Sequence, residues 1–161
     1  MVRFTVGQPD FRTPSSVVDS AKKALDDGEH GYTRSQGSEV VCNAVAAHLK
    51  KYQIDVDSND VLISPGCKQA LLYAMMSCLN PGDEVILFAP AWPSYDGMLK
   101  LIGAVPIHVP VKRENYHPDI DATMAAITDK TKAIIINSPN NPTGAVYLPS
   151  EIEDLTKIAV E

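Results

Sequence analysis

The sequence predicts an α/β domain built around a parallel sheet. Short apolar segments of strand character, such as residues 84–88 and 105–111, alternate with amphipathic segments of helical length. Residues 132–137 contain the run Ala-Ile-Ile-Ile, which is typical of a parallel strand covered on both faces. In open sheets of this kind, ligands bind at the carboxyl ends of the strands.

Two helices are expected in the first part of the chain. Thr13 suits the N-cap and Pro14 the first helical position, and Gly28 is the expected stop of the helix that follows. The second helix is expected over residues 38–52. Its apolar face is predicted at Val41, Val45 and Leu49.

The middle of the chain is expected to alternate strand and helix. Residues 61–63 predict a short strand, which Pro65-Gly66 breaks before a helix over residues 67–79. The string Asn-Pro-Gly-Asp at 80–83 predicts a turn, and residues 84–88 predict the next strand.

The same alternation continues toward the C-terminus. A helix is expected over residues 94–102, a strand over 105–111, a short helix over 120–127 and a strand over 132–137.

The last expected helix begins with a capping box formed by Ser150 and Glu153. Its apolar stripe runs to Glu161 without a Gly or Pro stop signal, and no strand follows it. This pattern predicts that residues 1–161 are the N-terminal part of a larger domain.

Composition narrows the class of protein. The chain has 161 residues, of which 45% are hydrophobic and 21% charged, so it can form a core. Its net charge of -6 and the lack of a Lys/Arg block argue against nucleic acid or an anionic membrane as the main partner. Its apolar runs are too short to span a bilayer.

The cysteines and histidines show no metal-site spacing. Three cysteines are scattered, which fits a reducing cytoplasm better than a disulfide framework. Four histidines lie apart from one another, and no metal site is expected from them. These residues are Cys42, Cys67, Cys78, His30, His48, His108 and His117.

The string Ser64-Pro65-Gly66-Cys67-Lys68 can bind an anion. The main-chain N–H groups and the helix dipole converge where a helix begins, and this favours a phosphate. The string is neither a P-loop nor a Rossmann fingerprint. An ordinary turn with a surface lysine is the alternative.

Two further loops follow expected strands. Trp92, the single tryptophan, follows the strand at 84–88 and can stack on a flat heterocycle; a ring that caps the core is the alternative. In the string Asn-Ser-Pro-Asn-Asn-Pro-Thr-Gly at 137–144, prolines hold an Asn side chain rigidly, and its amide can donate to a phenolate-type oxygen. The alternative is a plain turn.

These motifs, taken together, carry a resemblance. The ordered strings are Gly-Gln-Pro-Asp-Phe, Tyr-Thr-x-x-x-Gly, Gly-Cys-Lys-Gln-Ala-Leu, Pro-Gly-Asp-Glu-Val, Pro-Ala-Trp-Pro-Ser-Tyr and Asn-Ser-Pro-Asn-Asn-Pro-Thr-Gly-Ala-Val-Tyr. In order and spacing they resemble the class I/II, fold type I aminotransferases that use pyridoxal 5'-phosphate (PLP), and bacterial and archaeal aspartate aminotransferases in particular. The resemblance implies the three-layer large domain of that fold, with a parallel or mixed sheet, truncated within residues 1–161.

The resemblance implies roles for particular residues. Gly66, Cys67 and Lys68 match the turn that binds the PLP phosphate, mainly through main-chain N–H groups. Trp92 matches the aromatic ring that stacks on the pyridine, and Asn141 the amide that bonds the ring hydroxyl oxygen; both also border the substrate. Cys67 stands where the family often has another small residue.

Two more matches lie in the loops near the N-terminus. Gly7 matches a glycine whose main chain meets the substrate carboxylate, and Tyr32 a tyrosine that reaches the phosphate of the neighbouring subunit. The resemblance therefore implies a homodimer with shared active sites.

No catalytic residue is assigned within residues 1–161. The family's aspartate for the pyridine nitrogen, its Schiff-base lysine and its carboxylate-binding arginine match nothing in this chain, and Lys68 matches the phosphate turn instead. The implied reaction moves an amino group from an L-amino acid to a 2-oxo acid, with aspartate and 2-oxoglutarate favoured. The chain alone is expected to be inactive.

Three other functions stay open at this stage. A C–S β-lyase or an enzyme similar to ACC synthase shares these motifs, and an aminotransferase-like domain can also serve as a ligand sensor. A nucleotide-binding domain without PLP is disfavoured, because the glycine-rich fingerprints are absent.

Overall fold

The computed structural model describes residues 7–160, and these fall into two compact units, residues up to Ile63 and residues from Ser64 onward. The elements of the first are α1 (Ser15–Asp26), α2 (Glu39–Leu49) and the 3-10 turn η1 (Lys50–Tyr52). Those of the second are α3 (Cys67–Cys78), β1 (Glu84–Ala89), α4 (Ser94–Leu101), β2 (Val105–Pro110), α5 (Ile120–Ala125), β3 (Thr131–Ile135) and α6 (Pro149–Val160).

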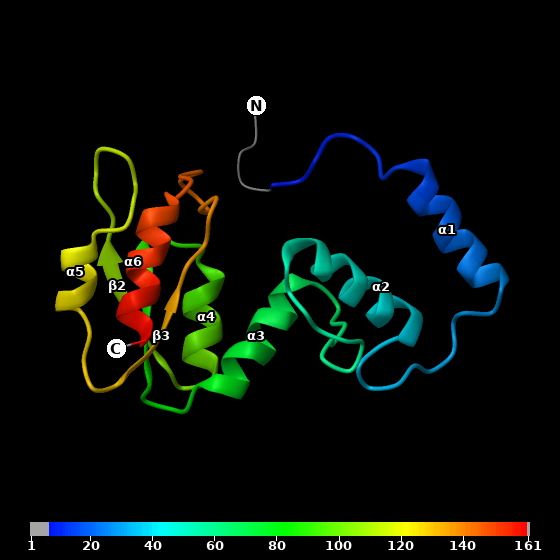
Figure 1. The fold of residues 1–161 in the computed structure, drawn as a ribbon, viewed down its shortest axis with the longest axis horizontal. Coiled ribbons are helices and arrows are strands. Elements are labelled where there is room, and N and C mark those ends of the chain that lie inside the picture. The colour runs from blue at the N-terminus through cyan, green and yellow to red at the C-terminus, as the bar shows by residue number, and fades with distance from the viewer. Residues whose placement is uncertain (1–6, 161) are drawn as a thin grey trace. The chain divides into compact units, whose positions relative to one another are not determined.

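The second unit is a three-layer α/β sandwich (Figure 1). Its three strands are parallel in the order β2-β1-β3, so β1 lies in the middle. Helices α3 and α4 cover one face of the sheet, and α5 and α6 cover the other. The predicted parallel sheet is confirmed, and the strands β1, β2 and β3 lie where the sequence predicts them.

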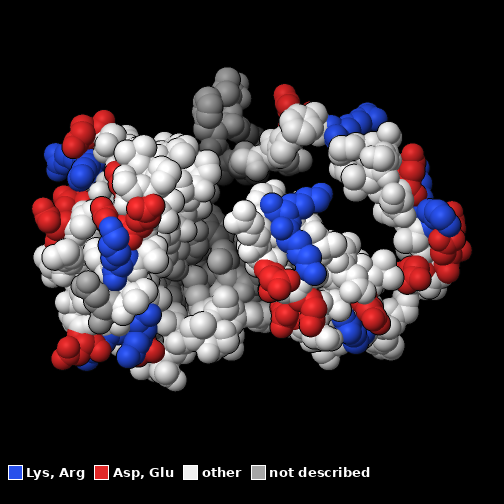
Figure 2. Space-filling view, in the orientation of Figure 1, with Lys and Arg blue, Asp and Glu red and all other residues white. Residues whose placement is uncertain are grey.

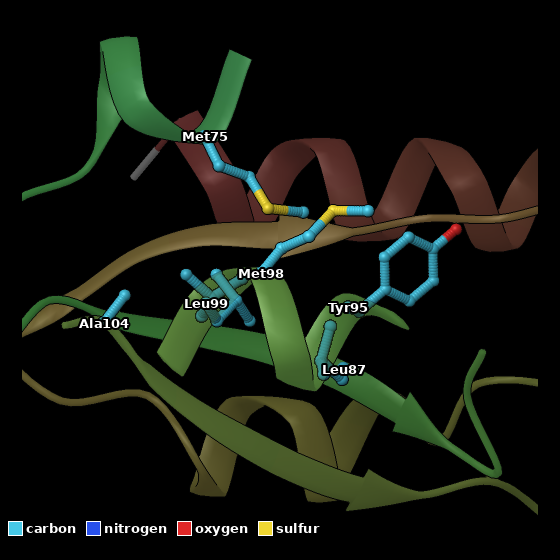
Figure 3. Packing of buried hydrophobic residues seen from close by; sticks show 7 residues of the cluster. Met75, Leu87, Tyr95, Met98, Leu99 and Ala104 are labelled. Carbon is cyan, nitrogen blue, oxygen red and sulfur yellow. The ribbon is translucent and has the colours of Figure 1, made fainter. Parts of the chain in front are cut away.

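Burial on both sides of β1 explains its uninterrupted apolar sequence. Val85 and Leu87 point into the cluster beneath α3 and α4, whereas Ile86 and Phe88 point into the cluster beneath α5 and α6. All four side chains are buried, which is the pattern of a central parallel strand. Figure 3 shows the first cluster, where Met75 of α3 and Met98 of α4 lie side by side above the sheet.

The first unit has a much smaller core. Cys42 and Ala46 of α2 pack against Val61, and these three are its buried hydrophobic residues among those described. The predicted face of α2 is right at Val45, which packs against this core, and wrong at Val41, which is exposed while Cys42 is buried. The regular helix also ends at Leu49, and η1 completes the expected segment.

The strand predicted at residues 61–63 does not form. Val61 is buried, but no strand of residues 7–160 pairs with the segment, and the Ile63 N–H donates to the Gln36 carbonyl at 2.9 Å. An apolar triplet becomes a strand only where a partner can pair its main chain. This prediction is therefore wrong for the structure of this chain.

Two predicted helix starts are corrected. Pro14 is the N-cap of α1, without a side-chain cap bond, so Thr13 lies one residue outside the helix. The predicted capping box of Ser150 and Glu153 is wrong, because α6 already begins at Pro149. Glu151 does the capping, and its carboxylate accepts the Leu148 N–H at 2.8 Å.

Candidate functional site

The N-terminus of α3 is a site of exposed donors. Gly66, the N-cap, adopts φ +94° and supplies no side-chain cap, and the first turn carries no acidic residue. The next N–H groups lie in the first turn, where an α-helix offers them no acceptor. By contrast, the Asp119 carboxylate caps α5 by accepting the Ala122 N–H at 3.0 Å. The start of α3 therefore presents unneutralised positive potential.

The indole of Trp92 lies beside this helix start. The Lys68 ammonium Nζ sits 5.2 Å from the centroid of the Trp92 ring, within cation–π range. Tyr95 meets the same ring edge to face, with ring centroids 5.3 Å apart. Trp92 is half-buried and packs against the cluster beneath α3 and α4, so the structure brings together two of the three predicted site loops.

Cys67 also borders this cluster of side chains. Burial raises the pKa of the Tyr95 hydroxyl, and the charge interaction with nearby Cys67 raises it further. Cys67 itself is exposed, and it forms no disulfide. Its place in the first turn of α3 suits the predicted contact through the main chain.

The loop after β3 is tied to the loop that carries Trp92. The Asn140 side-chain amide is buried and donates to the Pro90 carbonyl at 3.3 Å and to the Thr143 hydroxyl at 2.8 Å. Asn141, the next residue, is exposed, and its amide makes no hydrogen bond within residues 7–160. Its amide is thus available to a ligand at the carboxyl edge of the sheet.

A groove runs between α3 and α4. It has a volume of about 560 Å³, and Leu72, Met98 and Leu101 form much of its apolar wall. Lys68 and Ser94 contribute polar groups to the same groove. Lys68 is therefore shared between the groove and the Trp92 face.

Tyr32 and Gly7 lie in the first unit, and their predicted roles stay predictions. Both residues are exposed. Tyr32 lines a hollow of about 710 Å³ beside α1 and the start of α2. The structure thus brings Gly66, Cys67, Lys68 and Trp92 together and ties the Asn141 loop to the Trp92 loop, whereas the other two belong to a separate unit.

Two contributors were missed by sequence reasoning. Tyr95 packs on Trp92, and its position at the start of α4 behind a proline was the available signal. Asn140 is the buried member of the Asn-Asn pair, and no pattern in the string distinguishes it from Asn141. Only packing against Pro90 separates the two roles.

The histidines with partners each pair with a single carboxylate. His108 contacts Asp96 at 3.0 Å, and His117 contacts Glu151 at 2.8 Å. No group of three His, Cys, Asp or Glu side chains that could hold a metal occurs among residues 7–160. The same residues include no helix long and apolar enough to cross a bilayer. Acidic and basic side chains are intermingled on the face shown in Figure 2.

Comparison with known proteins defines the class. A family model for aminotransferase class I and II matches residues 1–161, and the chain belongs to this family. The aspartate aminotransferase of Sulfolobus acidocaldarius is 42% identical over 99% of this chain and 41% of its own length.

Solved structures agree with this assignment. The aspartate aminotransferase of Thermus thermophilus with maleate has a TM-score of 0.92 and 39% identity, over 97% of this chain and 41% of that one. The alanine aminotransferase of Pyrococcus furiosus has a TM-score of 0.89 and 33% identity, over 94% of this chain and 39% of that one. The chain thus spans about two fifths of the length of these relatives.

Proposed function

We propose that this chain forms part of the cofactor site of a PLP-dependent aminotransferase. The enzyme would move an amino group from an L-amino acid to a 2-oxo acid. The observation that carries the proposal is the uncapped start of α3 beside the Trp92 indole, with Asn141 on a loop tied to the same edge. A flat, phosphorylated ring with an oxygen substituent needs such a donor set.

Each loop would hold a different part of the cofactor. The N–H groups of Cys67 and Lys68 suit the phosphate, because the helix start is positive and carries no competing carboxylate. The Gly66 N–H donates to the Ser64 carbonyl at 2.7 Å in this structure, so Gly66 would bind the phosphate only after giving up that bond. The Trp92 face suits the pyridine ring, and the Asn141 amide suits the ring oxygen. When bound, PLP supplies the electron sink that an amino acid needs when it loses its Cα proton.

Lys68 would respond to the phosphate. Its ammonium lies over the indole face, where the attraction is modest. A phosphate at the start of α3 is a stronger partner for the same charge, because charge-assisted hydrogen bonds exceed a cation–π contact. We expect the Lys68 side chain to leave part of the indole face when the anion binds.

The substrate and the oligomer are narrower parts of the proposal. Aspartate is favoured because several relatives are named aspartate aminotransferases, and 2-oxoglutarate is its favoured acceptor. The Tyr32 ring is fully exposed, which suits the proposed contact with the phosphate of a second subunit in a homodimer. Gly7 is proposed at the substrate carboxylate.

Residues 1–161 alone are proposed to bind cofactor without turnover. No lysine of the site is assigned to the Schiff base, because Lys68 belongs to the phosphate turn. Transamination needs such a lysine to carry the proton. Turnover of aspartate and 2-oxoglutarate by this chain with PLP would contradict this part of the proposal.

Binding of pyridoxamine 5'-phosphate to the 161-residue chain tests the site. This probe lacks the aldehyde of PLP, so it cannot react with surface lysines. By isothermal titration calorimetry we expect Trp92→Leu to weaken binding about tenfold through lost stacking, and Asn141→Ala about threefold to tenfold through a lost hydrogen bond.

Asn80→Ala is the matched control, because Asn80 is exposed on the turn before β1. It should bind as the unchanged chain does. Unchanged affinity in both site variants, with circular dichroism showing folded protein, would refute the assigned roles.

A further inference from the structure

The buried amide of Asn140 links the two loops that flank the proposed cofactor ring. The side chain is 6% exposed although its neighbour Asn141 is exposed. Its Nδ2 lies 3.3 Å from the Pro90 carbonyl, fifty residues away in the sequence, and 2.8 Å from the Thr143 hydroxyl. Both N–H donors of this amide therefore have an acceptor.

The chemistry of the partners fixes which atom faces them. The Pro90 carbonyl can only accept a hydrogen bond, so the group that faces it must be a donor. The amide nitrogen of Asn supplies two donors, one for each partner. Neither an aspartate carboxylate nor an aliphatic side chain could make both bonds.

The link lies beyond the point where β1 and β3 stop pairing. The register between these two strands ends at Leu87 and Ile135, and past it β1 pairs only with β2. Within residues 7–160, the Asn140–Pro90 bond is the hydrogen bond that joins the two loops past that point. Trp92 follows Pro90 by two residues, and Asn141 follows Asn140 directly.

Hydrogen bonds within the loop after β3 hold Asn140 in place on that loop. The Asn140 N–H donates to the Ala145 carbonyl at 2.8 Å, and the Gly144 N–H donates to the Asn140 carbonyl at 2.7 Å. The Thr143 hydroxyl in turn accepts the Ala145 N–H at 3.2 Å. Because the loop closes on itself, a shift at Asn140 carries Asn141 with it.

We propose that Asn140 is a positioning residue that sets the spacing between the Trp92 indole and the Asn141 amide. It touches neither the cofactor nor the substrate, and acts through the Pro90 and Thr143 contacts. The inference rests on the proposed function, in which these two groups hold opposite parts of one ring. Spacing matters there, because a ring can use a stacking face and a hydrogen bond together only when the two are held at matching positions.

The first test needs no cofactor. Trp92 is the sole tryptophan of the chain, so acrylamide quenching of its fluorescence reports on the β1 loop directly. Asn140→Asp keeps the side-chain shape but sets a carboxylate against the Pro90 carbonyl, and it should raise the quenching constant about twofold at pH 8, as the buried link is lost.

Ser138→Ala is the matched control in the same loop. It removes the bond in which the Tyr147 N–H donates to the Ser138 hydroxyl at 2.9 Å, and leaves the link to Pro90 intact. It should leave the quenching constant unchanged. Equal quenching in the two variants and the unchanged chain would overturn the inference.

The second test measures affinity for pyridoxamine 5'-phosphate. Asn140→Asp should weaken binding about tenfold at pH 8, the range for losing a buried hydrogen bond, whereas Ser138→Ala should not. Burial raises the pKa of an introduced carboxyl, and a protonated carboxyl can donate again. The ratio of affinities, variant to unchanged chain, should therefore move back toward one as the pH falls to 5.

Two outcomes separate this inference from the proposed function. If the unchanged chain binds no probe, the proposed function fails while the quenching test still decides whether Asn140 holds the Trp92 loop. If the chain binds but Asn140→Asp and Ser138→Ala lose affinity equally, the positioning role is wrong. Should Asn140→Asp fail to fold, Asn140→Ser removes the link without adding charge, and should show the same losses without the pH dependence.

Discussion

Each unit of the chain contains an amphipathic helix, but only the helix of the second unit is buried on its apolar face. Helix α4 of the second unit buries three hydrophobic side chains, Tyr95, Met98 and Leu99, against the sheet. Helix α1 of the first unit is the more amphipathic of the two in sequence, yet none of its residues is buried. The comparison teaches that an apolar stripe predicts which face of a helix can be buried, whereas burial itself needs a partner surface.

The difference matters for the proposed site. The loops with Trp92 and Asn140 follow strands of a sheet that is covered on both faces, and Gly66 begins α3, which packs on one of these faces. Tyr32 stands in a unit with three buried hydrophobic residues among those described. The groups proposed to hold the cofactor ring thus lie within the second unit.

Truncation of one leucine in each unit should give the largest difference in the free energy of unfolding. Leu99 is 0% exposed between α4 and the sheet, whereas Leu25 of α1 is 60% exposed. We expect Leu99→Ala to lower the free energy of unfolding by about 2–5 kcal/mol through lost burial and a cavity. Leu25→Ala should change it by about 0.5 kcal/mol or less. Urea unfolding followed by circular dichroism and by Trp92 fluorescence measures both.

A comparable loss of unfolding free energy in Leu99→Ala and Leu25→Ala would contradict the difference between the two units. It would mean that α1 is packed in solution against a surface that the described residues do not show. Leu155→Ala, on the opposite face of the sheet, is the second core variant, because Leu155 is also 0% exposed. Its loss should match that of Leu99→Ala.

Loss of one carboxylate contact in each unit should give a smaller difference in unfolding free energy. Glu151 is half-buried, and its carboxylate accepts both the His117 ring N–H and the Leu148 N–H, each at 2.8 Å. We expect Glu151→Ala to cost about 1–3 kcal/mol of unfolding free energy, since it leaves the half-buried His117 ring N–H and the helix-capping Leu148 N–H without this acceptor. The Lys23–Asp27 pair on α1 is exposed. Lys23→Gln should cost about 0.5 kcal/mol or less.

Chemical denaturation at pH 7 checks this contrast. Glu151→Gln is the informative companion, because its amide oxygen can still accept the Leu148 N–H. It should retain part of the lost stability. An effect of Glu151→Ala no larger than that of Lys23→Gln would show that the cap and the His117 contact contribute little.

The sequence predicted the second unit better than the first for a physical reason. The strands β1, β2 and β3 carry apolar runs that only a covered sheet explains, and the turn at 80–83 and Gly66 punctuate them clearly. The triplet at 61–63 has the same local composition, but a strand also needs a pairing partner, which is not a local property.

Within the site, the sequence motifs predicted which loops form it, but not which residue of each loop is buried and which is exposed. Asn140 and Asn141 are identical in type and adjacent, so local chemistry cannot tell the buried link from the exposed amide. The deciding contact is to Pro90, fifty residues earlier. Similarly, the start of α6 depends on Pro149 and on Glu151, whereas the Ser150 and Glu153 pattern was equally plausible from spacing alone.

The smallest expected effect lies at alkaline pH. Burial raises the pKa of the Tyr147 hydroxyl above 10.0, and the Glu151 carboxylate raises it further. The folded chain therefore keeps this proton at pH values where the unfolded chain releases it. Stability from this source is complete below pH 10 and is lost as the pH rises through the folded pKa.

Tyr147→Phe should consequently flatten the alkaline fall in unfolding free energy between pH 9 and 11. The ring keeps its edge-to-face packing on Phe88, with centroids 6.2 Å apart, so stability near neutrality should change little. Tyr32→Phe is the matched variant in the first unit, where the ring is fully exposed, and it should leave the profile unchanged. If the unfolding free energy of the unchanged chain and that of Tyr147→Phe fell in parallel with pH, the Tyr147 hydroxyl would be as well hydrated as that of Tyr32. The buried core of the second unit would then not extend to the start of α6.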